Sequence, residues 1–354
     1  MILSLLLLTQ PVPAFAASAP TPRAEAAVMM SGDGGVLYAK NADTRRLIAS
    51  TTKLMTALVC LENTSIDDVF TAQERHCRVE GSSMYLKAGE RYTVRELLLG
   101  LLLSSGNDAA LALAEYTAGS EGAFVQMMNR KAQELGLRDT HFENPHGLDA
   151  KSHYSTASDL ARLMLACMEN GAFRSLAVQR SAEVKGLTLL NHNKLLTLCP
   201  GCVGGKTGYT RAAGRCLVSC CERDGMRLAC VTLSDPDDWN DHRALYDWAY
   251  ADFTLHDLHA EFSFDVPVIS GSRSSVRVVP APGSAAVLPR DRETVIRAEL
   301  PRFVFAPVSA GEAAGTLTVL RDGDAAVTFP LIYAGDAALA DPCIRIFDRE
   351  ESSS

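Results

Sequence analysis

The spacing of apolar residues changes from a helical to a strand period near Lys206, and this change constrains the fold more than any other feature of the chain. Before it, the run TVRELLLGLLL at residues 93–103 is apolar nearly all round, which predicts a buried helix. After it, residues 215–221 and 226–233 have the character of two strands around an Asp-Gly turn. The chain therefore combines helices with an antiparallel hairpin.

The order of the elements predicts the fold class. Residues 26–39 indicate a β-hairpin with a glycine-rich turn, and they precede all the predicted helices. The predicted helices are residues 53–60, 93–103, 108–116, 121–135, 155–169 and 237–253. Asn107 is the expected cap of the third of these helices, and Ser155 or Thr156 that of the fifth. Strands, helices, strands and a final helix predict one α+β domain with an antiparallel sheet.

A second domain is indicated by a shift in composition near His259. Short β-type runs punctuated by Pro and Gly begin there and continue for about 80 residues, within the usual size range of a domain. We place the α+β domain at residues 17–257, a small all-β domain at 258–340 and a polar tail at 341–354.

The N-terminus has the features of a secretory signal. The apolar run Ile2–Leu8 is followed by two prolines and then by Ala14-Phe15-Ala16-Ala17. This order matches an apolar core and a small-residue cleavage site near Ala16, so residues 1–16 predict a signal peptide and export of the protein. A buried N-terminal strand is the alternative, but the prolines and the alanine-rich tail fit it poorly. The formal net charge of -8 provides no basic surface for nucleic acid.

Ten cysteines in an exported chain raise the question of disulfides. The predicted hairpin turn would place Cys220, Cys221 and Cys230 opposite Ala229, Leu228 and Ser219. No two of these cysteines face each other, so we interpret most of them as small buried hydrophobic residues. Cys199 and Cys202 form a single Cys-x-x-Cys pair, which is a weak zinc signal, and either a loop disulfide or two free thiols remains open there.

The segment CVGGKTGYT at residues 202–210 contains Gly-Lys-Thr and could suggest a phosphate-binding loop. That loop requires a glycine at position 200, where the chain has Pro200. It also requires a following helix whose N-terminal amides hold the phosphates, whereas a β-type run follows here. Spacing and context therefore exclude a nucleotide site.

Three short motifs together indicate serine acyl transfer instead. Ser50-Thr51-Thr52-Lys53 places a hydroxyl and an amine on one face of a helix start, where a lysine of lowered pKa can activate a serine. Ser105-Gly106-Asn107 lies between two predicted helices, and Lys206-Thr207-Gly208 begins a strand. Each motif alone has an ordinary explanation, as a cap, a helix-breaking turn or a strand start. The occurrence of all three by chance, in this order and in these structural contexts, is much less probable than that of any one of them.

The chain here resembles the low-molecular-mass penicillin-binding proteins that are serine-type D-alanyl-D-alanine carboxypeptidases, in the wider β-lactamase and transpeptidase superfamily. The resemblance runs from about residue 26 to residue 253. It is carried by residues 49–56, 105–109, 144–149 (NPHGLD), 154–157 and 206–210. It implies a β-lactamase/transpeptidase-like domain, an antiparallel sheet with a helical cluster, followed by a small all-β sandwich domain.

The resemblance also implies a role for each motif residue. Ser50 would attack the D-Ala-D-Ala peptide bond, with Lys53 accepting its proton. Ser105 would relay a proton to the leaving D-alanine, and Asn107 would orient the side chains and the substrate amide. On the strand, Lys206 would supply positive charge, Thr207 would bind the terminal carboxylate, and the N–H groups of Ser50 and of Tyr209, beside Gly208, would form the oxyanion hole.

The sequence departs from its relatives at two functional positions. The deacylation element of class A β-lactamases is not apparent between Asn107 and Lys206, which favours a peptidase over a lactamase. Some relatives carry an arginine for the substrate carboxylate just before the last helix, where this chain has Asp237-Asp238-Trp239. Arg211 or Arg243 could substitute for it, or no residue does.

The resemblance therefore predicts an exported enzyme, on the outer face of the membrane or in the cell wall, that removes the terminal D-alanine of peptidoglycan stem peptides. It implies no metal or organic cofactor, and β-lactams as covalent inhibitors. Two alternatives stay open at this point: a D,D-endopeptidase acting on cross-links, and a weakly active penicillin-binding wall module. Association with a membrane is open as well.

Overall fold

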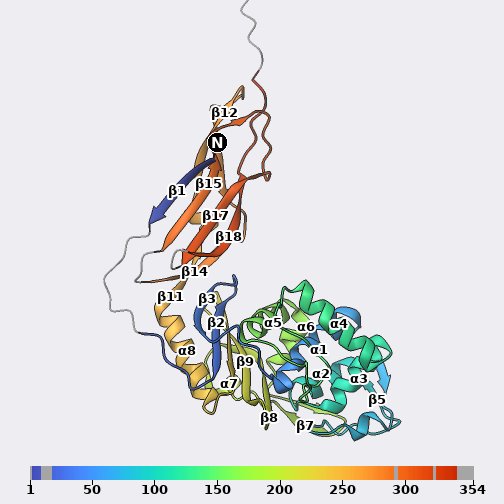
Figure 1. Cartoon of the computed structure of the whole chain (residues 1–354). Helices are drawn as coiled ribbons and strands as arrows, with labels where there is room; N and C mark the ends of the chain where they lie inside the picture. Colours follow the sequence, from blue (N-terminus) through green and yellow to red (C-terminus); the bar gives the residue numbers. More distant parts are fainter. Residues whose placement is uncertain (1, 9–17, 291–293, 322–323, 341–354) are drawn as a thin grey trace, which may run out of the picture. The chain divides into compact units, whose positions relative to one another are not determined.

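The computed structural model describes residues 2–8, 18–290, 294–321 and 324–340 of the chain (Figure 1). The chain divides into two compact units. One ends at Thr254, and the other begins at Leu255 and includes the N-terminal strand β1 (Ile2–Leu8). The first unit combines helices with an antiparallel sheet and the second consists mainly of strands, so the predicted fold class is confirmed. The domain limits at 257 and 258 stay a prediction.

The sheet of the first unit has five antiparallel strands in the order β3-β2-β10-β9-β8. Their bounds are β2 Ala26–Ser31, β3 Val36–Lys40, β8 Cys202–Thr210, β9 Gly214–Arg223 and β10 Met226–Leu233. In the hairpin of β9 and β10, Cys221 lies opposite Leu228, as the turn at Asp224-Gly225 predicts. Two smaller hairpins pair β4 Val69–Thr71 with β5 Arg91–Thr93, and β6 Ser181–Val184 with β7 Leu187–Leu190.

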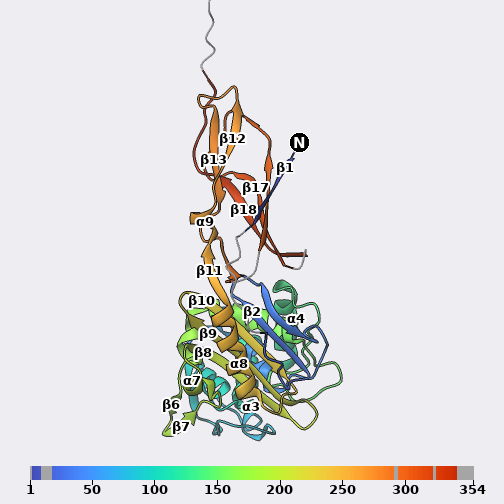
Figure 2. The ribbon, with the colours of Figure 1, turned by 90° about the vertical axis from the view of Figure 1, so that its left-hand side faces the viewer.

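Helices cover both faces of this sheet. Their bounds are η1 Ala49–Thr52, α1 Lys53–Asn63, η2 His76–Arg78, α2 Val94–Leu102, α3 Asn107–Ala118, α4 Glu121–Glu134, α5 Ala157–Glu169, α6 Gly171–Ala177, α7 Leu195–Leu198 and α8 Asp238–Asp252. Figures 1 and 2 show α8 alone against β9 and β10, while α5 packs on β2 and β10 from the helical cluster on the other side. α1 contacts α2, α3, α4 and α5, so the element that carries the first motif lies in the centre of the cluster.

Side chains define where the helices begin. Thr93 and Glu96 form a capping box: the Thr93 hydroxyl accepts from the Glu96 N–H, and the Glu96 carboxylate accepts from the Thr93 N–H. The Thr156 hydroxyl accepts from the Asp159 N–H at 3.1 Å, so Thr156 rather than Ser155 caps α5. The prediction that Asn107 caps α3 is wrong, because Gly106 occupies the cap position and the Asn107 side chain makes other contacts.

The second unit has its own core and its own sheets. Its elements, including the strand through which the chain enters it, are β11 Phe253–Asp257, α9 Leu258–Glu261, β12 Phe264–Ile269, β13 Ser275–Pro280, β14 Ala285–Pro289, β15 Val295–Pro301, β16 Val304–Phe305, β17 Ala313–Arg321 and β18 Asp324–Tyr333. The larger sheet has the order β1-β15-β17-β18-β13-β12-β16. Alternating residues of these strands, such as Val276 and Val278 on β13, fill the core.

The segment predicted as a signal forms β1, which pairs antiparallel with β15 from Ile2 opposite Pro301 to Leu8 opposite Val295. Pairing in the full-length chain does not conflict with removal on export, so the signal stays a prediction. Its cleavage position near Ala16 and the polar tail at 341–354 lie outside the described residues. Among the described residues, no helix is both long and apolar enough to span a bilayer.

Candidate active site

Ser50 and Lys53 lie at the junction of η1 and α1, where the chain turns into the central helix. Lys53 is fully buried, and its Nζ donates to Ser50 Oγ at 2.9 Å, to Asn107 Oδ1 at 2.7 Å and to the His146 carbonyl at 2.7 Å. Three acceptors satisfy the three protons of the ammonium group. Burial, together with the charge of Lys206, holds the pKa of Lys53 well below its usual range. The lysine is thus prepared to lose a proton and to act as a base.

Ser105 and Asn107 enter the site from the turn between α2 and α3. Ser105 is buried and has a positive φ of 60°, a strained backbone conformation for a residue other than glycine. The Asn107 amide donates to the Glu80 carbonyl at 2.6 Å while its Oδ1 accepts from Lys53. The neighbouring Asp108 accepts N–H bonds from Met84 and Leu86, which fixes the loop ahead of α2 beside the same turn.

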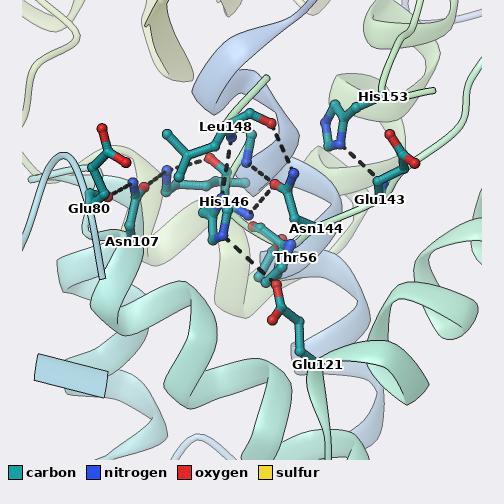
Figure 3. Close-up of polar contacts among 12 residues, drawn as sticks. Thr56, Glu80, Asn107, Glu121, Glu143, Asn144, His146, Leu148 and His153 are labelled. Carbon is teal, nitrogen blue, oxygen red and sulfur yellow. Dashed lines mark hydrogen bonds and ion pairs between the residues drawn. The ribbon is translucent and has the colours of Figure 1, made fainter. Parts of the chain in front are cut away.

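The loop NPHGLD at 144–149 packs against the start of α1, and Figure 3 shows its residues Asn144, His146 and Leu148 beside Thr56. Its His146 carbonyl accepts from Lys53, and its Pro145 carbonyl accepts from the Thr56 hydroxyl at 2.6 Å. The Asn144 side chain closes the loop on itself by accepting from the Gly147 N–H and donating to the Leu148 carbonyl. The loop therefore holds both the first and the second turn of α1.

The two histidines near this loop are neutral at pH 7. The His146 ring lies 3.8 Å from Glu121, but burial and the charge of Lys53 lower its pKa to about 4. Burial also lowers the pKa of His153 to about 4, and its ring is hydrogen-bonded to the Thr52 hydroxyl. No positive charge from these rings therefore competes with Lys53.

Strand β8 brings the third motif to η1. A Cβ at Gly208 would lie 3.0 Å from both the Ile48 carbonyl oxygen and the Ser50 nitrogen, so only a residue without a side chain allows this approach. Lys206 is buried, its Nζ donates to the Thr207 carbonyl at 2.8 Å, and burial lowers its pKa to about 7. At the end of the strand the Thr210 hydroxyl donates to Asp149, which ties β8 to the loop at 144–149.

The three motifs meet at one cavity of about 480 Å³. Its lining residues are Ser50, Ser82, Ser105, His192, Thr207, Gly208, Tyr209, Arg215, Asp238 and Trp239. Five of the eight residues predicted from the sequence are among them. The other three, Lys53, Asn107 and Lys206, are buried behind this lining. The structure thus brings all eight together.

Arg215 also lines this cavity, whereas the sequence patterns predicted that Arg211, Arg243 or no residue would bind the substrate carboxylate. Arg215 is the cross-strand partner of Tyr209, and its guanidinium bonds Asp238 through two nitrogens at 2.5 and 3.1 Å. It also lies over the Trp239 ring at 5.7 Å. The short turn between Thr210 and Gly214 could have predicted this position, because it pairs residue 215 with residue 209.

A serine next to a buried lysine, a second serine and an asparagine, and a lysine-bearing edge strand define a serine acyl-transfer enzyme. Among the described residues, no group of His, Cys, Asp and Glu side chains is arranged to hold a metal ion.

Comparisons with known proteins identify the family. A family model for D-alanyl-D-alanine carboxypeptidase matches residues 13–237. The chain is 33% identical over 319 residues to the D-alanyl-D-alanine carboxypeptidase DacF of Bacillus subtilis, covering 84% of this chain and 82% of that one. With DacB2 of Mycobacterium tuberculosis it shares 36% identity over 251 residues, covering 67% and 86%. This chain belongs to the D-alanyl-D-alanine carboxypeptidase family.

Solved structures agree with this assignment. Penicillin binding protein 5 from Haemophilus influenzae superimposes with a TM-score of 0.81 at 28% identity, covering 91% of this chain and 99% of that one. The D-alanyl-D-alanine carboxypeptidase DacD from Francisella tularensis gives a TM-score of 0.72 at 26% identity, covering 94% and 97%. Both matches extend over the two units of the chain.

The loop at 144–149 generates a prediction about folding. Gly147 has φ +87°, and a Cβ there would lie 2.0 Å from the Ala49 carbonyl oxygen. Gly136 also has a positive φ, +67°, but a Cβ there would meet nothing within 4 Å. We expect Gly136→Ala to cost about 1–2 kcal/mol of unfolding free energy, which is the cost of the left-handed conformation alone. Gly147→Ala should cost about 1–3 kcal/mol more, since the packing around Ala49 must also shift.

Urea unfolding of the two variants and the unmodified chain measures both costs. Equal losses for the two glycines would contradict a tight contact between the loop and η1.

Proposed function

We propose that this chain removes the terminal D-alanine from peptidoglycan stem peptides through an acyl-enzyme formed on Ser50. The observation that carries the proposal is the contact of 2.9 Å between Ser50 Oγ and the Nζ of a fully buried lysine whose pKa is lowered. Membership in the D-alanyl-D-alanine carboxypeptidase family supports the substrate class.

In the acylation step, neutral Lys53 takes the proton of Ser50 as Oγ attacks the carbonyl carbon of the scissile peptide bond. Ser105 lines the same cavity and passes a proton to the nitrogen of the departing D-alanine. Asn107, fixed by Glu80 and Lys53, keeps the lysine in place during this transfer. Lys206 adds a nearby charge that keeps the Lys53 pKa low.

The negative oxygen of the tetrahedral intermediate would be held by the backbone N–H groups of Ser50 and Tyr209. The close approach of β8 to η1 at Gly208 supports this arrangement, because it brings the two backbones together. A donor of this kind contributes on the order of 3 kcal/mol to lowering the barrier. Water then attacks the ester carbonyl, Lys53 accepts its proton, and Ser50 is released.

We infer that the terminal carboxylate of the substrate is bound by Thr207 and Arg215. A guanidinium group has five N–H donors, of which Asp238 occupies two, so donors remain to bind a carboxylate in the cavity. Asp238, itself nearly inaccessible, holds the arginine in one orientation. Such a preset fork suits a carboxylate better than a flexible surface arginine would.

The proposed reaction depends on the hydroxyl group of Ser50. Ser50→Ala should abolish D-alanine release from a diacetyl-Lys-D-Ala-D-Ala peptide, because the nucleophile is lost. It should also abolish the covalent mass increase after treatment with a penicillin, since β-lactams resemble the acyl-D-Ala-D-Ala end. Mass spectrometry and a D-alanine assay measure the two effects.

The matched control is Ser82→Ala, which removes another hydroxyl of the cavity lining and should preserve the penicillin adduct. An adduct on a residue other than Ser50 would refute the site. A stable adduct without D-alanine release by the unmodified chain would instead favour a weakly active penicillin-binding module. Cleavage of a cross-linked peptide without release of D-alanine from the uncross-linked peptide would favour an endopeptidase.

The proposed carboxylate contact can be tested at Arg215. Arg215→Ala should lower kcat/KM for the D-Ala-D-Ala acid by about 10- to 100-fold, the usual worth of a hydrogen bond to a charged group. Activity on the corresponding C-terminal amide, which lacks the carboxylate, should change far less. Steady-state kinetics on the two substrates separates loss of carboxylate binding from general damage.

Arg211→Ala and Arg243→Ala are the matched controls, because neither arginine lines the cavity. Both should keep the preference of the unmodified enzyme for the acid. If Arg215→Ala lowers activity on acid and amide equally, the proposed carboxylate contact is wrong.

We also propose that the enzyme is exported and acts outside the cytoplasm, where its wall substrate lies. The apolar run at residues 2–8 and the small-residue segment after it support this proposal. On expression with its native N-terminus in a bacterium, the mature protein should be recovered outside the cytoplasm and should begin near Ala17. N-terminal sequencing after cell fractionation gives the answer, and an intact Met1 in the cytoplasmic fraction would contradict export.

A further inference from the structure

Three cysteines gather where the chain enters β8, outside the cavity of the active site. Cys199 precedes the strand, Cys202 begins it, and Cys221 lies on β9 directly opposite Cys202. The sulfur atoms of Cys199 and Cys221 are 3.7 Å apart. A disulfide requires about 2.05 Å, so a side-chain rotation of modest size would suffice to form one. Cys199 therefore has a thiol partner on the neighbouring strand, in addition to Cys202, which lies close to it in the sequence.

The backbone fixes this arrangement. The Gly201 carbonyl accepts from the Glu222 N–H at 2.8 Å, and the Cys202 N–H bonds the Cys199 carbonyl at 3.2 Å. Gly201 has φ +76°, and a Cβ there would lie 2.6 Å from the Glu222 carbonyl oxygen. The turn at 199–202 thus lies tightly against β9 and holds the sulfur atoms in place.

The surroundings lower the pKa of two of the three thiols. A hydrogen bond from Cys221 lowers the pKa of Cys199 to about 7, and the guanidinium of Arg223, 3.4 Å from the Cys199 sulfur, acts in the same direction. Cys221 also lowers the pKa of Cys202 by a hydrogen bond. Burial raises the pKa of Cys221, so this thiol keeps its proton.

Accessibility distinguishes the roles. Cys199 and Cys221 are buried, whereas Cys202 is partly exposed. A reagent from solution therefore meets Cys202 first, and only then can the buried pair react. The thiolate is the form that attacks a disulfide, which makes Cys202 the entry point.

We propose that Cys199, Cys202 and Cys221 form a thiol–disulfide exchange site, in which a small-molecule or protein disulfide reacts at Cys202 and the product is a Cys199–Cys221 disulfide. This modification lies outside the hydrolytic site and does not depend on the proposed reaction there.

The exchange proceeds in three steps. The Cys202 thiolate attacks one sulfur of the external disulfide R–S–S–R, forms a mixed disulfide and releases RS⁻. Cys221 gives its proton to the Cys199 thiolate and attacks the Cys202 sulfur, which releases a second RS⁻. Cys199 then attacks the Cys221 sulfur while its proton passes to the leaving Cys202. Two protein thiols are oxidised, and one external disulfide is reduced to two thiols.

The bond would close a loop of 22 residues that contains all of β8. Cross-linking a loop of this size restricts the unfolded chain and stabilises the folded one. The edge strand that carries Lys206 and Thr207 would then be tethered to β9 at the end opposite the catalytic serine.

The test treats the full-length chain with glutathione disulfide at neutral pH, followed by digestion without reductant and mass spectrometry. We expect a linked peptide containing Cys199 and Cys221, and a melting temperature raised by about 5 °C or more over the reduced protein. Cys202→Ser should give the same linked peptide at least about tenfold more slowly, because the entry thiol is lost.

Cys77→Ser is the control, since it removes an exposed cysteine on η2 and should leave the rate and the product unchanged. Glutathione that stays on Cys202, a Cys199–Cys202 product, or no linkage at all would overturn the proposal, as would an unaltered rate in Cys202→Ser. Mass spectrometry reads the bond directly, so the result is independent of whether the protein releases D-alanine.

Discussion

The burial of the Lys53 ammonium group is the constraint on which the rest of the site depends. A fully buried amine is costly unless all its protons are accepted, and here Ser50, Asn107 and His146 accept them. These acceptors come from η1, from the start of α3 and from the loop at 144–149. One side chain therefore requires three distant segments of the chain to meet. The same burial lowers the lysine pKa, so stability and reactivity have one physical origin.

Local patterns sufficed to predict much of this protein. The cap at Thr156, the helical spacing of apolar residues and the Asp-Gly turn act over a few residues, which is why helix positions and the register of β9 and β10 follow from the sequence. The eight motif residues were identifiable because acyl-transfer chemistry needs those residue types and because the order of the three motifs resembles that of a known family. Their convergence on one cavity required the fold.

Long-range packing explains what the sequence could not reveal. Asparagine is a common helix cap, but the Asn107 side chain donates to the Glu80 carbonyl and accepts from Lys53 instead. The buried lysine needs this acceptor more than the helix needs a cap. Arg215 looks like an ordinary strand residue until pairing with Tyr209 and the ion pair with Asp238 place it in the cavity. Likewise, Cys221 became the partner of Cys199 only through the turn that lies against β9.

The meeting of three segments at Lys53 also has a consequence for the chain before it folds. An extended or partly folded chain carries an ordinary serine and an ordinary, fully charged lysine, neither of which reacts with an acyl donor. The nucleophile exists only once α3 and the loop at 144–149 have packed against α1. Folding is thereby the activation step of the catalyst, and an unfolded chain is chemically inert.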